Sequence, residues 1–157
     1  ELKSPERYPG IERLILEELA RHGLDRPGAD PATPVLLQSF TASSLEIFTK
    51  ELRTPLPVHF LLGARDAAAW LTPEGLTRLK GFATGFSPEK TILGDPQYVA
   101  AIAQLRHARV PITPYTFRAT TVKGFDEVQA EMAHYRHGLR VDGVSTDNPD
   151  RRRVRAR

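Results

Sequence analysis

Short apolar runs alternate with segments of helical periodicity along almost the whole chain, and this alternation constrains the fold more than any other feature. The apolar runs predict strands over residues 1–3, 35–40, 58–62, 81–86, 111–117 and 141–146. The periodic segments predict helices over residues 11–22, 43–52, 72–80, 95–108 and 125–137. Short strands separated by helices indicate an α/β fold with a parallel sheet, either doubly wound or closed into a barrel.

Local signals mark the ends of several predicted helices. Ser43 and Glu46 have the spacing of a capping box. Thr72 directly before Pro73 is a typical N-cap followed by a typical first helical residue. Gly23 is expected to end the first helix, because glycine adopts the left-handed backbone of a C-cap without strain.

The length of the chain limits which of these folds can be complete. Its 157 residues, 40% of them hydrophobic, suffice for one buried core, but a full eightfold βα barrel takes about 250 residues. No apolar run approaches the roughly 18 residues of a membrane-spanning helix, so we expect no stable membrane insertion. The chain has no cysteine, which excludes disulfides and a cysteine nucleophile but leaves the compartment open.

The basic character of the sequence comes from its last seven residues. The net charge is +3, and residues 151–157 (RRRVRAR) contain five of the 22 Lys and Arg. Without them 17 basic residues face 19 acidic ones, a net charge of −2 for residues 1–150. We therefore expect a folded domain over residues 1–150 and a poorly ordered tail over 151–157. Nucleic acid is not an expected partner, because the tail has no aromatic side chains to stack on bases.

Polar and aromatic residues follow the predicted strands at their carboxyl ends, where α/β folds bind ligands. They are Lys3, Gln38, Ser39, the pair 84–85, residues 115–117 and the pair 146–147. Glu1 and Lys3 are two residues apart on a strand, so their side chains face the same side. A carboxylate suits a hard divalent cation and an ammonium suits a phosphate. On spacing alone, an ordinary surface ion pair is the more frequent explanation.

Several common catalytic motifs are absent. The sequence contains no GxxxxGK[ST] or GxGxxG nucleotide loop, no GxSxG elbow and no HExxH zinc motif. Four of the five histidines fall near the ends of predicted helices, where an exposed side chain is the ordinary interpretation; they are His22, His107, His134 and His137. His59 lies in a predicted strand and faces either the core or a ligand.

Four segments taken together resemble the glycerophosphodiester phosphodiesterase family. They are ELKSP at the start, LLQSF at 36–40, ITPYTF at 112–117 and VDGVSTDNPD at 141–150, and their order and spacing match. The family fold is an eightfold βα barrel of the TIM type in which the Glu-x-Lys strand is the third. The resemblance therefore implies that residues 1–150 form about six βα units, strands three to eight, of such a barrel.

The resemblance also implies an activity, the metal-dependent hydrolysis of small glycerophosphodiesters to glycerol 3-phosphate and an alcohol. It implies that Glu1 is one ligand of the metal, calcium or magnesium, and that Lys3 acts as a catalytic residue on the phosphodiester. The family's two catalytic histidines and its Glu-x-Asp metal pair precede Glu-x-Lys and are absent from these residues. The resemblance thus implies the carboxyl-terminal part of an enzyme, inert by itself.

Other residues are implied to line the substrate pocket. Gln38, Ser39 and Phe40 match the family's strand-end motif there, and Tyr115 replaces a tryptophan that many members carry as an aromatic wall. Asp147 belongs to the family's Thr-Asp-x-Pro ending and is expected to order the last loop. The Tyr-Thr variant resembles a branch of often exported enzymes, which favours a periplasmic or extracellular location.

Two alternatives to this function stay open. The first is a related phospholipase-type phosphodiesterase that acts on lipids. The second is a non-catalytic or truncated barrel that binds phosphate-containing ligands.

Overall fold

The computed structural model describes residues 1–152 and contains a parallel sheet whose three strands follow the order of the chain. The strands are β1 (Leu37–Ser39), β2 (Val58–Leu62) and β3 (Gly85–Pro88). All five residues of β2 are buried, as expected for the central strand of a covered parallel sheet. The predicted α/β fold with a parallel sheet is therefore confirmed.

Single parallel bridges continue the sheet beyond both of its edges. They join Leu2 to Ser39, Phe86 to Ile112, Glu89 to Tyr115, and Phe117 to Thr146. The predicted strands at 1–3, 111–117 and 141–146 thus occur only as isolated bridges. The ladders on the two sides of segment 111–117 are interrupted at Pro88 of β3 and at Pro114, because neither proline has a backbone N–H to donate. The arrangement is compatible with part of a barrel.

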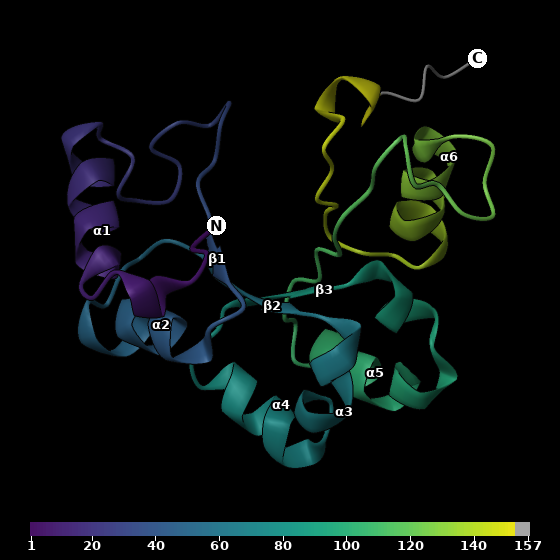
Figure 1. Cartoon of the computed structure of the whole chain (residues 1–157), viewed down its shortest axis with the longest axis horizontal. Helices are drawn as coiled ribbons and strands as arrows, with labels where there is room; N and C mark the ends of the chain where they lie inside the picture. The colour runs from purple at the N-terminus through teal and green to yellow at the C-terminus, as the bar shows by residue number, and fades with distance from the viewer. Residues whose placement is uncertain (153–157) are drawn as a thin grey trace.

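Helices cover the sheet and connect its strands. They are α1 (Ile11–Arg21), α2 (Ala42–Glu46), α3 (Ala67–Trp70), α4 (Pro73–Lys80), α5 (Val99–His107) and α6 (Val128–Ala133). Figure 1 shows them arranged around the sheet, from α1 and α2 beside β1 to α5 and α6 beyond β3. α2 and α6 each continue into a π-helical turn, at Ile47–Glu51 and His134–Gly138. No helix in residues 1–152 is long and apolar enough to cross a membrane.

The predicted N-caps have two different outcomes. The Thr72 hydroxyl accepts a hydrogen bond from the Gly75 amide at 3.1 Å, which confirms it as the N-cap of α4. The capping box at Ser43 is wrong, because α2 begins at Ala42 and Thr41 is its N-cap. The chain extends from the end of β1 straight into α2, so the helix starts before the serine that the pattern selected.

The third strand also differs from its predicted range of 81–86. The amides of Phe82 and Ala83 still donate to the Leu79 carbonyl, so a turn that follows α4 occupies the first half of that range. β3 begins at Gly85. At the other end of the chain, Pro149–Arg152 form a 3₁₀ turn. The rest of the predicted tail, residues 153–157, lies outside the described residues.

The core lies between the sheet and the helices and is rich in aromatic residues. Its largest fully buried side chains include Phe48, Phe60, Phe82 and Phe86. A second, smaller cluster forms where Phe117 packs against Val128 and Met132 of α6. This second cluster holds α6 against Phe117, which forms the last bridge of the sheet. The cluster therefore helps to position the residues around Phe117.

Candidate functional site

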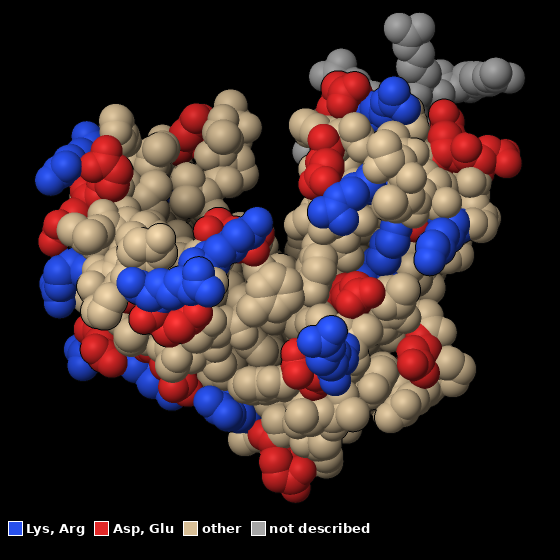
Figure 2. Space-filling view, in the orientation of Figure 1, with Lys and Arg blue, Asp and Glu red and all other residues tan. Residues whose placement is uncertain are grey.

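A pocket of about 890 Å³ opens at the carboxyl ends of the strands. Its walls come from residues 1–6, the end of β1, residues 115–118 and residues 145–147. These segments are far apart in sequence, and the bridges described above bring them together. In the space-filling view the surface is hollowed between the part that carries α1 and α2 and the part that carries α6 (Figure 2). The pocket thus lies at the edge of the sheet where the sequence predicted a ligand site.

Glu1 and Lys3 both line this pocket. Leu2 between them is 6% exposed and anchors the segment, because its amide donates to the Gln38 carbonyl at 2.8 Å. The Lys3 ammonium lies 4.0 Å from a Glu1 carboxylate oxygen, with 79% of the lysine side chain exposed. Lys3 is therefore only loosely paired and is free to contact a ligand in the pocket.

The residues at the end of β1 have two different roles. Gln38 and Phe40 line the pocket, as expected. The expectation that Ser39 lines it is wrong, because Ser39 is fully buried. Its hydroxyl donates to the Leu2 carbonyl at 2.8 Å and accepts from the Thr41 amide at 3.1 Å. Ser39 therefore joins the first segment to β1 rather than facing the pocket.

Tyr115 and Phe40 form an aromatic corner of the pocket. Their rings meet edge to face with centroids 5.6 Å apart, and Phe40 is 50% exposed. Burial raises the pKa of the Tyr115 hydroxyl, and the nearby carboxylates of Glu89, Glu1 and Asp66 raise it further. The phenol therefore stays protonated and can donate a hydrogen bond, while the rings offer an apolar surface to a ligand.

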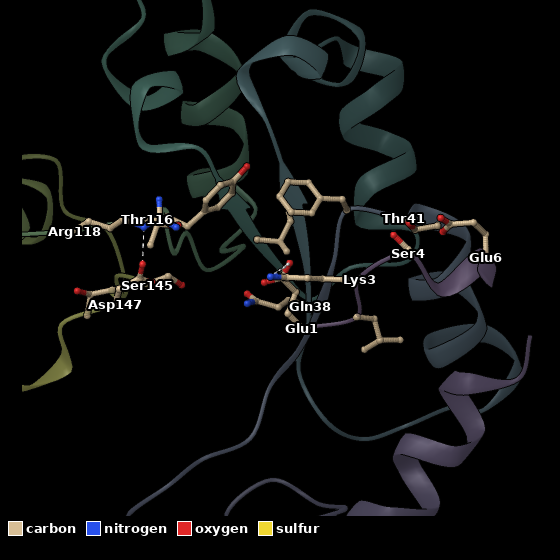
Figure 3. Close-up of a pocket in the computed structure, with 15 residues that line it drawn as sticks. Glu1, Lys3, Ser4, Glu6, Gln38, Thr41, Thr116, Arg118, Ser145 and Asp147 are labelled. Atoms are coloured by element: carbon tan, nitrogen blue, oxygen red, sulfur yellow. Dashed lines mark hydrogen bonds and ion pairs between the residues drawn. The ribbon is translucent and has the colours of Figure 1, made fainter. Parts of the chain in front are cut away.

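Arg118 also lines the pocket, although the sequence did not single it out. Its Nε donates to a carboxylate oxygen of Asp147 at 2.5 Å. Asp147 was expected to order the last loop, and its amide does donate to the Phe117 carbonyl at 3.2 Å. Figure 3 shows Arg118, Thr116, Ser145 and Asp147 together on one side of the pocket. The only sequence signal for Arg118 was its place one residue after an apolar strand end.

The comparison with known proteins agrees with the sequence motifs. No family model matches the chain. Over 150 residues the chain is 30% identical to a protein of Bacillus subtilis (strain 168) named glycerophosphodiester phosphodiesterase. The chain is related to the glycerophosphodiester phosphodiesterases. The similarity covers 96% of this chain and 45% of the relative, so the chain spans less than half of that protein's length. This similarity supports the family that the four motifs predict.

The family resemblance implies a divalent metal, which needs several oxygen ligands in or near this pocket. A calcium ion takes six to eight oxygen ligands and magnesium six. Within residues 1–152 no three His, Asp or Glu side chains are grouped so that they could hold a metal ion. His134 and His137 are not part of such a group either. The described residues therefore do not form a complete metal site, and Glu1 is at most one contributor.

His59 lies inside the molecule, next to Gln38 in the sheet register but outside the residues that line the pocket. The side chain is buried, and its Nδ1 lies 3.2 Å from the Ser87 hydroxyl. Across the pairing with β3, a Cβ on Gly85 would stand 2.2 Å from His59 Nε2. Burial lowers the pKa of His59, and the Asp142 carboxylate opposes this shift. The imidazole is therefore held neutral.

The lowered pKa of His59 makes stability depend on pH. The unfolded chain binds a proton at the ordinary histidine pKa of about 6.5, whereas the folded chain resists it. The free energy of unfolding should therefore fall as the pH drops below about 6.5. Denaturant titrations of the full-length protein at about pH 7.5 and about pH 5.5 measure this fall, and His59→Gln should reduce it. His22→Gln, at an exposed position, should not. An undiminished fall in His59→Gln would contradict the assignment.

Proposed function

We propose that this chain is the carboxyl-terminal part of a metal-dependent phosphodiesterase that hydrolyses glycerophosphodiesters to glycerol 3-phosphate and an alcohol. The observation that carries the proposal is the shared pocket of Glu1, Lys3, Gln38, Phe40 and Tyr115. The family motifs imply a role in metal binding, catalysis or substrate binding for each of these five residues. The similarity to a protein named glycerophosphodiester phosphodiesterase supports the proposed phosphodiesterase activity.

Each side chain has a part in the proposed reaction. The Lys3 ammonium attracts the anionic phosphodiester by charge and hydrogen bonding. The edge-to-face pair of Phe40 and Tyr115 offers an apolar wall to the carbon atoms of the substrate. Glu1 would supply one carboxylate to the metal, and the remaining ligands would come from other residues of the full-length protein. When bound, such a cation neutralises and polarises the phosphodiester.

The bond changes in the proposed hydrolysis are simple. A water molecule attacks phosphorus, the bond from phosphorus to the alcohol oxygen breaks, and the departing oxygen takes up a proton. General acid and base groups are needed for the two proton transfers. Among the described residues no histidine lines the pocket. We therefore assign these proton transfers to histidines elsewhere in the full-length protein, as the family resemblance implies.

The lack of a pocket histidine among residues 1–152 also favours a second candidate. In that candidate the barrel binds phosphate-containing ligands without hydrolysing them. The two functions share the pocket but differ in turnover, so they are separated by an activity measurement.

The decisive test uses the full-length protein that contains this chain. Incubation with glycerophosphocholine should release choline and glycerol 3-phosphate in equal amounts, each measured by an enzyme-coupled assay. A chelator should abolish release, and added calcium or magnesium should restore it. Binding of glycerol 3-phosphate without any release of choline would favour the non-catalytic alternative, and chelator-resistant turnover would remove the metal from the proposal.

A further inference from the structure

Arg118 is directed to the pocket by the residue that precedes it. Phe117 is fully buried and packs against Tyr135, with ring centroids 5.0 Å apart, in the cluster under α6. Neighbouring residues of extended backbone point to opposite sides, and Thr116 and Arg118 both line the pocket. The packing of one aromatic ring thus fixes the side on which the guanidinium lies.

Several hydrogen bonds hold Nε of Arg118 and the backbone on either side of this residue. Its Nε donates to Asp147 at 2.5 Å. The next amide, that of Ala119, donates to the Asn148 side chain at 2.8 Å, and the Thr146 hydroxyl donates to the Phe117 carbonyl at 2.8 Å. Because Asp147 uses only Nε, the two terminal nitrogens keep their four N–H donors. Paired donors of this kind match two oxygens of a phosphate.

Lys3 and Arg118 are the two basic residues among those that line the pocket. In Figure 3 they lie on different sides of it, Lys3 beside Glu1 and Arg118 beside Asp147. Lys3 makes only a long contact of 4.0 Å, whereas Arg118 is anchored at 2.5 Å. Arg118 is therefore the better oriented of the two cations, since a guanidinium that is already held in place loses less conformational entropy on binding.

We propose that Arg118, oriented by Asp147, is a phosphate-binding residue of this pocket and contacts the phosphoryl oxygens of substrate and product. The inference rests on the proposed function for the identity of the ligand, a phosphate ester of glycerol. It adds a second cation to the site and makes Asp147 a positioning residue. Asp147 acts through Arg118 and does not touch the ligand.

The test measures binding rather than turnover, in the full-length protein. Isothermal titration with glycerol 3-phosphate, inorganic phosphate and glycerol gives three affinities for each variant. Arg118→Gln should weaken binding of both phosphate compounds at least tenfold, as expected for the loss of a charged hydrogen-bond pair. Glycerol binding should not change. Asp147→Asn should weaken phosphate binding less, and in turnover it should raise KM more than it lowers kcat.

A matched control is available on α1. Arg21 forms an exposed pair with Glu18 at 3.0 Å, outside the pocket. Arg21→Gln should leave all three affinities unchanged. The inference is overturned if Arg118→Gln binds phosphate as well as Arg21→Gln does, if it lowers only the melting temperature, or if the unaltered protein binds neither phosphate compound. Arg118-dependent phosphate binding in a protein without turnover would support this inference and contradict the proposed hydrolysis.

Discussion

Replacing Lys3 with methionine should lower kcat/KM for glycerophosphocholine in the full-length protein by two to three orders of magnitude, as is typical when one preorganised charge partner of a transition state is lost. The lysine lines the pocket, and its ion pair within residues 1–152 is the long one to Glu1 at 4.0 Å. Because 79% of its side chain is exposed, the melting temperature should hardly change. Steady-state kinetics and a thermal melt of the same preparation check both statements.

The control for this prediction is a lysine of similar exposure elsewhere. Lys50 pairs with Glu46 at 3.2 Å, with 55% of its side chain exposed, and it does not line the pocket. Lys50→Met should retain full activity. If Lys3→Met kept more than about a third of the activity, a transition-state role for Lys3 would be refuted.

Replacing Lys90 with methionine should lower the free energy of unfolding by about 3–5 kcal/mol, because it leaves a buried carboxylate without its partner. Lys90 Nζ lies 2.5 Å from Glu131 Oε1, and the two side chains are 16% and 3% exposed. The other oxygen, Oε2, is buried without a hydrogen-bond partner. The ammonium also lies 5.1 Å from the centroid of the Phe117 ring. Urea titration of the full-length protein measures the change.

Two comparisons show whether the burial of this pair causes the loss. Lys50→Met breaks an exposed pair of the same chemistry and should cost no more than about 0.5 kcal/mol. Replacing both Lys90 and Glu131 with methionine removes both charges and should recover most of the loss. A loss below about 1 kcal/mol in Lys90→Met would contradict the assigned role of this buried pair.

The elements that the sequence predicted well are those decided by local pattern. β2 has the predicted bounds, and its four apolar residues and His59 are all buried. The helix over 11–21 agrees because its C-terminal stop, Gly23, adopts a positive φ as expected. The strand over 111–117 was harder to predict. The segments with which it forms bridges are distant in sequence, and prolines limit its backbone hydrogen bonds. No local periodicity carries that information.

The candidate site also contains some residues that the sequence predicted and others that it did not. Lys3, Gln38 and Tyr115 were found because carboxyl ends of parallel strands meet at one edge, whereas Glu1 and Phe40 were selected through the family resemblance. Ser39 was misplaced because the strand-end rule does not say which side chain the backbone turns inward.

Arg118 was missed for a related reason. Its direction depends on Phe117, whose own direction is set by packing against α6. Such contacts between distant segments become visible only in three dimensions.

The close approach of His59 to Gly85 has a consequence for how sequences of this kind can diverge. The imidazole ring already fills the space that any side chain at position 85 would need. Positions 59 and 85 therefore share one fixed volume, although 26 positions separate them in the chain. A larger residue at 85 is admissible only together with a smaller one at 59, so the two positions are expected to change as a pair.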